Sequence, residues 1–116
     1  MSIKSMIEAV VSPVVPEIAR GEYTGEGDVF CVWDAAEIPD AFADNHAAAT
    51  RFQVQLHLCI PFEDEEDPQT WIDRVRNAIQ NEDLFSTPTV EPVETSDDDG
   101  YRLYVFEFEG ISMGGI

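Results

Sequence analysis

Apolar and polar side chains alternate most regularly between residues 51 and 60. The apolar set is Phe52, Val54, Leu56, Leu58 and Ile60, and the other set is Arg51, Gln53, Gln55, His57 and Cys59. Successive side chains of a β-strand point to opposite faces, so this pattern places the first set on a core. We therefore predict a central strand over residues 51–60, with Phe52, Val54, Leu56 and Leu58 buried against helices.

Two segments have the three- and four-residue spacing of an amphipathic helix. The first follows Ser2, a good N-cap residue, and ends at Pro13. Its apolar face is Ile3, Met6, Ile7, Val10 and Val11. The second begins where Asp67 precedes Pro68, which suits a cap followed by the first helical position. Its apolar stripe is Trp71, Ile72, Val75, Ala78 and Ile79.

The remaining β-type segments are shorter or less regular. Residues 14–18 are interrupted by Pro16 and predict an edge strand, and the glycine-containing residues 20–28 predict a loop. Residues 29–33 are a continuous β-type run. Residues 87–95 and 101–109 are two further β-type segments, joined by the predicted hairpin turn 96–100, in which Gly100 is able to take a positive φ.

The order of these elements predicts an α+β fold. An antiparallel or mixed sheet of four to five strands, with two helices packed on one face, satisfies it. The 116 residues are enough for one ordinary domain, so we expect a single domain over residues 1–116, with a flexible tail from about residue 110.

Charge restricts the classes of partner. The chain has 24 Asp and Glu against six Lys and Arg, a formal net charge of -18, and Lys4 is its one lysine. Such a surface repels phosphate backbones and anionic lipid, so we expect no tight nucleic-acid binding and no membrane partner. The acidity fits either solubility in a high-salt host or a surface past which nucleic acid slides. No apolar run approaches the roughly 20 residues of a membrane span, and the N-terminus does not resemble a signal peptide.

Candidate chemical groups each have a simpler structural explanation. The acids of residues 63–67 lack the spacing of a calcium loop and suit the start of a helix, and Asp97, Asp98 and Asp99 suit a solvated turn. Neither His46 nor His57 belongs to a nucleophile motif. The glycines of the predicted loop, Gly21, Gly25 and Gly27, match no phosphate-binding fingerprint. We therefore predict no catalytic, cofactor-binding or metal-binding residue, no cofactor and no enzymatic activity.

Two other groups of side chains are also interpreted as structural. Cys31 and Cys59 lie in strand-like runs and form no disulfide framework or zinc motif, so we expect small buried residues in a reducing cytoplasm. Aromatic residues cluster near the C-terminus: Tyr101, Tyr104, Phe106 and Phe108. A base-stacking sheet needs basic neighbours, whereas Glu107 and Glu109 interleave here, so these aromatics are expected in the core or under another subunit.

Several stretches in order along the chain resemble one family. Residues 37–45 read Glu-Ile-Pro-Asp-Ala-Phe-Ala-Asp-Asn, and residues 51–58 read Arg-Phe-Gln-Val-Gln-Leu-His-Leu. Together with Tyr23-Thr24-Gly25 and the acidic turn before Tyr104-Val105-Phe106-Glu107, they resemble the tail terminator or tail completion proteins of long-tailed bacteriophages and prophages. The chain departs from that pattern in its larger acidic excess and in Pro88 and Pro92 of the penultimate strand.

The resemblance implies a structural role. Members of that family assemble into a ring, commonly of six subunits, which caps the tail tube at its head-proximal end and joins it to the head. It implies contacts with tail-tube and head-connector proteins, and a location in the virion tail after assembly in the host cytoplasm. Long loops usually make the ring contacts in this family.

The long connection at residues 35–50 is the segment that the resemblance suggests for contacts between ring subunits. It contains no regular apolar period, and it carries Glu37, Asp40 and Asp44, with Asp34 just before it. Connections of this length are usually functional or mobile. We expect it to be mobile in the isolated subunit and ordered on assembly.

Two other classes of function stay open at this point. One is a stand-alone acidic binding protein, such as an immunity protein or a DNA mimic, which the net charge favours. The other is a small enzyme or ligand-binding domain, which requires a pocket with shifted titratable groups. A closed oligomer supports the tail subunit, whereas a monomer or dimer holding a basic partner supports the acidic binder.

Overall fold

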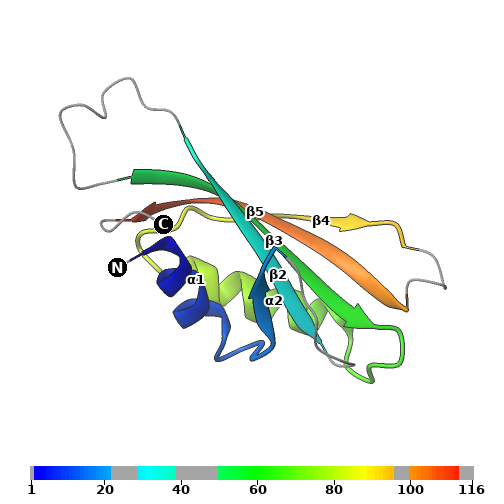
Figure 1. Cartoon of the computed structure of the whole chain (residues 1–116). Coiled ribbons are helices and arrows are strands. Elements are labelled where there is room, and N and C mark those ends of the chain that lie inside the picture. The colour runs from blue at the N-terminus through cyan, green and yellow to red at the C-terminus, as the bar shows by residue number, and fades with distance from the viewer. Residues whose placement is uncertain (1, 22–28, 39–49, 96–99, 113–116) are drawn as a thin grey trace.

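The computed structural model describes residues 2–21, 29–38, 50–95 and 100–112 (Figure 1). Within them the chain forms α1 (Ile3–Val11), β1 (Ile18–Arg20), β2 (Phe30–Glu37), β3 (Thr50–Pro61), α2 (Pro68–Gln80), β4 (Thr89–Val93) and β5 (Tyr101–Ser112). The strands make one five-stranded mixed sheet in the order β1-β2-β3-β5-β4. Both helices lie beneath the sheet in Figure 1, on the same face. The predicted α+β architecture is confirmed.

Strand β3 is the centre of the sheet, as its alternation predicts. It pairs antiparallel with β2 on one side and with β5 on the other, so that Leu56 lies between Trp33 and Phe106. All four predicted core side chains are buried: Phe52, Val54, Leu56 and Leu58. Gln53 and Gln55 are exposed on the opposite face. The register is therefore the one that puts the apolar set against the helices.

Both helices start where their capping residues predict. The Ser2 hydroxyl accepts a hydrogen bond from the Ser5 amide at 3.1 Å, and Asp67 Oδ1 accepts one from the Gln69 amide at 2.9 Å. The predicted stripes point inward, with the buried residues Ile3, Met6, Ile7, Val11, Ile72, Val75 and Ile79. Val10, Trp71 and Ala78, at the margins of the stripes, are half-buried.

The predicted edge strand at residues 14–18 is wrong in position. The amides of Val14 and Val15 both donate to the Val11 carbonyl at 2.9 Å, so the chain continues as a turn after α1. Pro16 has no amide to donate. The strand begins only at Ile18, where β1 pairs parallel with β2 at the edge of the sheet.

The run at residues 29–33 extends further than predicted, because β2 continues to Glu37. Backbone pairing with β3 carries on to Glu37 opposite Phe52, and the Ile38 amide donates to the Arg51 carbonyl at 2.9 Å. Hydrogen bonds between paired strands join backbone groups and do not depend on side-chain polarity. The polar end of β2 therefore has no sequence pattern that predicts a strand. Residues 35–37 and Thr50 therefore belong to strands, and residues 39–49, for which mobility is predicted, lie outside the described residues.

The C-terminal end is also more regular than predicted, because β5 includes Gly110, Ile111 and Ser112. A Cβ at Gly110 would come within 2.9 Å of the Phe85 ring and 3.0 Å of Ile3, so only glycine lets α1 pack this closely on β5. The rest of the predicted tail, residues 113–116, lies outside the described residues.

The first strand of the last hairpin is shorter than predicted. The segment predicted at residues 87–95 is the shorter strand β4, Thr89–Val93, at the sheet edge where its Pro92 is tolerated. Gly100 has the predicted positive φ, 79°. Residues 96–99 of the predicted turn lie outside the described residues.

The central position of β3 predicts a large difference between its two faces. Replacing Leu56, which is fully buried, by Ala should lower the free energy of unfolding by about 2–5 kcal/mol, because it leaves a cavity between sheet and helices. Gln53 lies on the opposite, exposed face of the same strand, so Gln53→Ala should change the free energy of unfolding by less than about 0.5 kcal/mol. Urea denaturation of both variants measures the difference, and equal effects would contradict the assigned register.

Candidate functional site

The face of the sheet turned away from α1 and α2 is not covered by any element in the described residues. The strand register determines which side chains lie on it, since paired residues share a face. Cys59 lies between Phe30 and Leu103, and His57 lies between Val32 and Val105. We call this surface the open face.

The open face is divided into two halves along the strands. One half is polar: Arg51 Nη2 lies 3.1 Å from Glu109 Oε1, and Gln55 Nε2 donates to Glu107 Oε1 at 3.4 Å. The other half is mainly apolar and spans every strand of the sheet, with His57 of β3 and Glu91 of β4 lying among its apolar side chains. These apolar side chains are Ala19, Phe30, Val32, Cys59, Val93, Tyr101, Leu103 and Val105. We call these eight residues the apolar patch.

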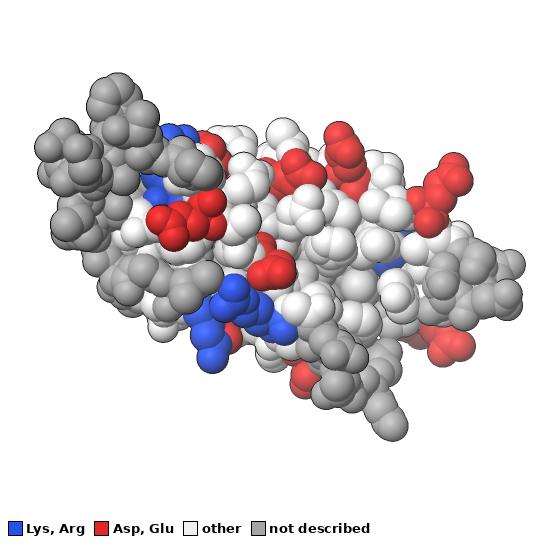
Figure 2. All heavy atoms as spheres, turned by 45° about the horizontal axis from the view of Figure 1, so that its top comes forward, with Lys and Arg blue, Asp and Glu red and all other residues white. Residues whose placement is uncertain are grey.

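Figure 2, which turns the top of the molecule in Figure 1 toward the viewer, shows mostly uncharged side chains in the middle of the surface, with separate carboxylates around and across them. Val93 is 42% exposed, and most other members of the patch are half-buried. A contiguous apolar surface on a soluble protein often marks a place where another molecule binds. The patch is therefore a candidate contact surface.

Two aromatic rings meet within the patch, and one of them belongs to Phe30, which pairs with Cys59. Phe30 and Tyr101 meet edge to face, with their centroids 5.8 Å apart, and Cys59 is only 4% exposed. Burial raises the pKa of the Cys59 thiol to about 11. Burial raises the pKa of Cys31 further still, with a smaller contribution from nearby Cys59. Both cysteines are buried and unpaired, as the sequence predicts, and both are protonated near neutral pH.

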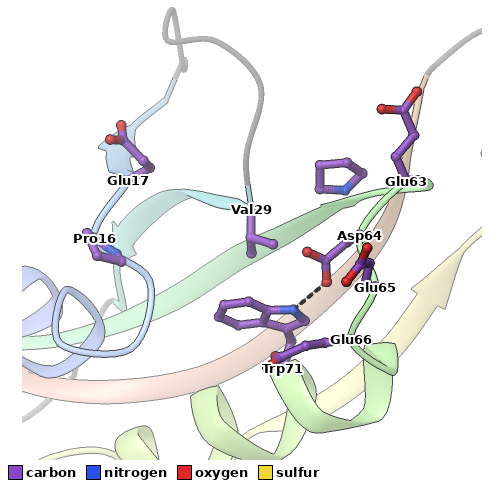
Figure 3. Close-up of a pocket in the computed structure, with 9 residues that line it drawn as sticks. Pro16, Glu17, Val29, Glu63, Asp64, Glu65, Glu66 and Trp71 are labelled. Atoms are coloured by element: carbon purple, nitrogen blue, oxygen red, sulfur yellow. Dashed lines mark hydrogen bonds between the residues drawn. The ribbon is translucent and has the colours of Figure 1, made fainter.

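A second candidate site is a cleft of about 790 Å³ at one end of the molecule (Figure 3). The turn before β1, the start of β2 and the β3–α2 connection surround it. Its lining residues are Pro16, Glu17, Val29, Pro61, Glu63, Asp64, Glu65, Glu66 and Trp71. The cleft thus has an apolar part formed by Trp71, Val29 and prolines, and an acidic rim.

Some of these acids have a structural role, which supports their interpretation as a helix-start turn. Asp64 Oδ2 accepts a hydrogen bond from Trp71 Nε1 at 2.9 Å. Glu66 pairs with Arg74 at 2.8 Å, and the Arg74 guanidinium lies 5.1 Å from the centre of the Trp71 ring. These contacts fix the acidic turn on α2, so at least Asp64 and Glu66 are engaged within the chain.

The other sequence candidates are not brought together by the fold. His57 lies half-buried on the open face between two valines, away from the acidic cleft. His46 and Asp97, Asp98 and Asp99 lie outside the described residues, as do Gly25 and Gly27. Among the residues that the structure describes, no group of three or more His, Cys, Asp or Glu is placed to hold a metal ion. No helix within those residues has the length and apolar character that crossing a membrane requires.

The aromatic residues near the C-terminus divide between the two faces of β5. Phe106 and Phe108 are buried in the core, and Tyr104 packs against it. Tyr101 lies on the open face, opposite Pro61. The core interpretation is therefore confirmed for Phe106 and Phe108, whereas coverage of Tyr101 by another subunit stays a prediction.

Sequence reasoning missed the apolar patch and the cleft. One signal for the patch was present: residues 29–33 are apolar without alternation, which is typical of a strand buried on both faces. Phe30 and Val32 are the residues of that run that point away from the helices. The cleft had no sequence signal, because it joins Pro16 to Trp71 across the fold.

Comparison of the sequence with known protein families gives no match, and comparison with curated proteins gives none either.

The raised thiol pKa values predict low reactivity of both cysteines. At pH 8, a thiol-reactive disulfide reagent should label the native chain many times more slowly than the urea-unfolded chain, because the reactive species is the thiolate. Labelling of Cys59 should rise as the pH approaches about 11. Rapid labelling of either cysteine in the folded chain at pH 8 would contradict the burial described above.

Proposed function

We propose that this chain is a structural subunit of a phage or prophage tail. In this proposal, copies of the chain close into a ring, commonly of six, which caps the tail tube at its head-proximal end and joins it to the head. Its partners are its own copies and the neighbouring tail-tube and head-connector proteins. It acts in the virion tail after assembly in the host cytoplasm, and no catalytic step is assigned to it.

The observation that carries the proposal is the apolar patch, which no helix or strand of the described residues covers. Helices occupy one face of the sheet, while the other face presents apolar side chains from all five strands of the described sheet. A subunit that functions inside an assembly needs such a surface, because burying it supplies the attraction between neighbours. The resemblance of residues 51–58 to tail terminator proteins is the reason for proposing a tail ring in particular. These residues form most of the central strand β3.

A second candidate function is a stand-alone acidic binding protein, such as an immunity protein or a DNA mimic. The specific observation in its favour is the cleft, where Glu63 and Glu65 lie beside an apolar part that contains Trp71. This arrangement suits a basic segment of another protein. The two functions predict different particle masses in solution. The acidic binder is a monomer or dimer on its own, whereas the tail subunit forms a larger closed oligomer.

Ring formation should strengthen as salt is added. Each copy carries a net charge of -18, so copies repel one another across every contact, and apolar burial must supply most of the attraction. The Debye length falls from about 30 Å at 0.01 M to about 8 Å at 0.15 M salt, which weakens the repulsion. Sedimentation velocity across a salt series, at several chain concentrations, measures the effect.

The opposite salt dependence would contradict this interface. Large species at low salt that dissociate as salt is added indicate contacts held by ion pairs. A chain that stays monomeric at every concentration and salt level would contradict the tail-subunit proposal itself and favour the acidic binder.

A further inference from the structure

We propose that the cleft at the end of the molecule binds a basic segment of another protein, in which arginine or lysine side chains lie next to apolar ones. The proposal names the occupant of the cleft that favours the second candidate function. It does not depend on the ring, because the cleft forms within one copy of the chain. Its size, its aromatic wall and the sign of its charge carry the argument.

The cleft is large enough for a segment of chain. Its volume of about 790 Å³ lies within the range of about 300–1,000 Å³ that is typical of ligand-binding clefts. Segments far apart in the sequence meet there, since Pro16 precedes β1, Val29 precedes β2, and residues 63–66 connect β3 to α2. The tertiary structure therefore forms the cleft without a partner.

The indole of Trp71 forms a fixed aromatic wall in the cleft (Figure 3). Its Nε1 donates to Asp64 Oδ2 at 2.9 Å, which holds the ring in place. The Arg74 guanidinium lies 5.1 Å from the ring centre, so this ring already stabilises one cation. Val29 and two prolines add apolar surface beside it. Such a wall suits the aliphatic stem of a lysine or arginine and a neighbouring apolar side chain.

Every titratable side chain that lines the cleft is a carboxylate. Asp64 and Glu66 are engaged within the chain, as described above. Glu63 and Glu65 are exposed, and neither makes a hydrogen bond or an ion pair with a residue that the structure describes. Their charges are available to a cationic side chain, which a carboxylate binds more strongly than it binds a neutral donor. A phosphate or carboxylate ligand is repelled.

The cation is expected to belong to a different protein. Among the described residues, no three His, Cys, Asp or Glu side chains are placed to hold a metal ion. An apolar wall gives a small hydrated cation no advantage, whereas apolar side chains of a peptide are stabilised by covering it. A second copy of this chain carries a net charge of -18 and is repelled. Four of its six cations are also ion-paired within the chain: Arg20, Arg51, Arg74 and Arg76.

Peptide binding tests the charge requirement. The probe is an amidated peptide in which four arginines alternate with three leucines, with a fluorescent label at its N-terminus. Its control has citrulline, an uncharged side chain of nearly the same shape, in place of every arginine. By fluorescence anisotropy at about 0.15 M salt, the arginine peptide should bind at least about tenfold more tightly than the control. Added salt should weaken this binding, the opposite of its effect on ring formation.

Two double variants test the carboxylates of the cleft. Glu63→Gln combined with Glu65→Gln should weaken binding of the arginine peptide about fivefold or more. The matched control combines Glu37→Gln with Asp83→Asn, at the far ends of elements that start near the cleft. Both double variants have a net charge of -16 instead of -18. Because the Debye length is about 8 Å at 0.15 M salt, the control should change the affinity by less than about twofold. Thermal melting confirms that both variants are folded.

Tryptophan fluorescence tests where the peptide binds. Trp33 is fully buried, whereas Trp71 is half-buried in the cleft, so dissolved acrylamide quenches mainly Trp71. A saturating amount of the unlabelled arginine peptide should reduce this quenching severalfold, because the peptide covers the indole.

The inference fails if the arginine peptide does not bind or if the citrulline peptide binds equally well. It also fails if the two double variants lose the same affinity, or if quenching of Trp71 is unchanged at saturation. None of these results bears on the ring, which the salt series tests by particle mass. A chain that stays monomeric and binds the arginine peptide as described would contradict the tail subunit and leave this inference intact.

Discussion

A five-stranded sheet has two faces, and the helices in the described part of this chain cover only one of them. The other face is not simply polar. Strand β3 is paired on both sides, and its two neighbours, β2 and β5, carry apolar residues on both faces of the sheet. Trp33 and Phe106 point to the helices and are fully buried. Phe30 and Leu103 point the other way, where no described element covers them. Within the residues that the structure describes, the second apolar surface is therefore left open to contact with another molecule or with water.

The free energies of burial and association indicate that a contact through the apolar patch depends strongly on salt and on chain concentration. Two rows of side chains across five strands span about 300 Å². His57 and Glu91 lie within these rows and Cys59 is only 4% exposed, so covering them contributes at most about 7 kcal/mol at roughly 25 cal/mol per Å². Association costs about 4–15 kcal/mol in lost translational and rotational freedom. With a charge of -18 on each copy adding repulsion, a single contact of this size is at best marginal at low salt. Four of the six cations, Arg20, Arg51, Arg74 and Arg76, already have carboxylate partners within the chain. Multiple contacts in a ring, and screening by salt, then decide whether the assembly forms.

The sequence predicts the core of this fold well, because the alternation of Phe52 to Ile60 and the caps Ser2 and Asp67 are local signals with direct physical causes. It predicts strand ends poorly. Glu37 and Ile111 are strand residues because their backbones pair with neighbours far away in the sequence, and their own side chains do not reveal this. The same limit applies to the candidate sites. The apolar patch assembles Phe30, Val93 and Leu103 from three strands, so it becomes visible only when the strand order and register are known.

The central claim is that the apolar patch is the surface that assembly covers. Hydroxyl-radical footprinting measures this directly, because Phe30 and Tyr101 react readily when water reaches them and lie together on the open face. The chain is labelled at low salt, where the account predicts dispersed copies, and at high salt and concentration, where it predicts assembly, with a free peptide as the dose standard. Labelling of Phe30 and Tyr101 should fall severalfold on assembly. Unchanged labelling of both rings in a fully assembled sample would show that the subunits meet elsewhere and would contradict the claim.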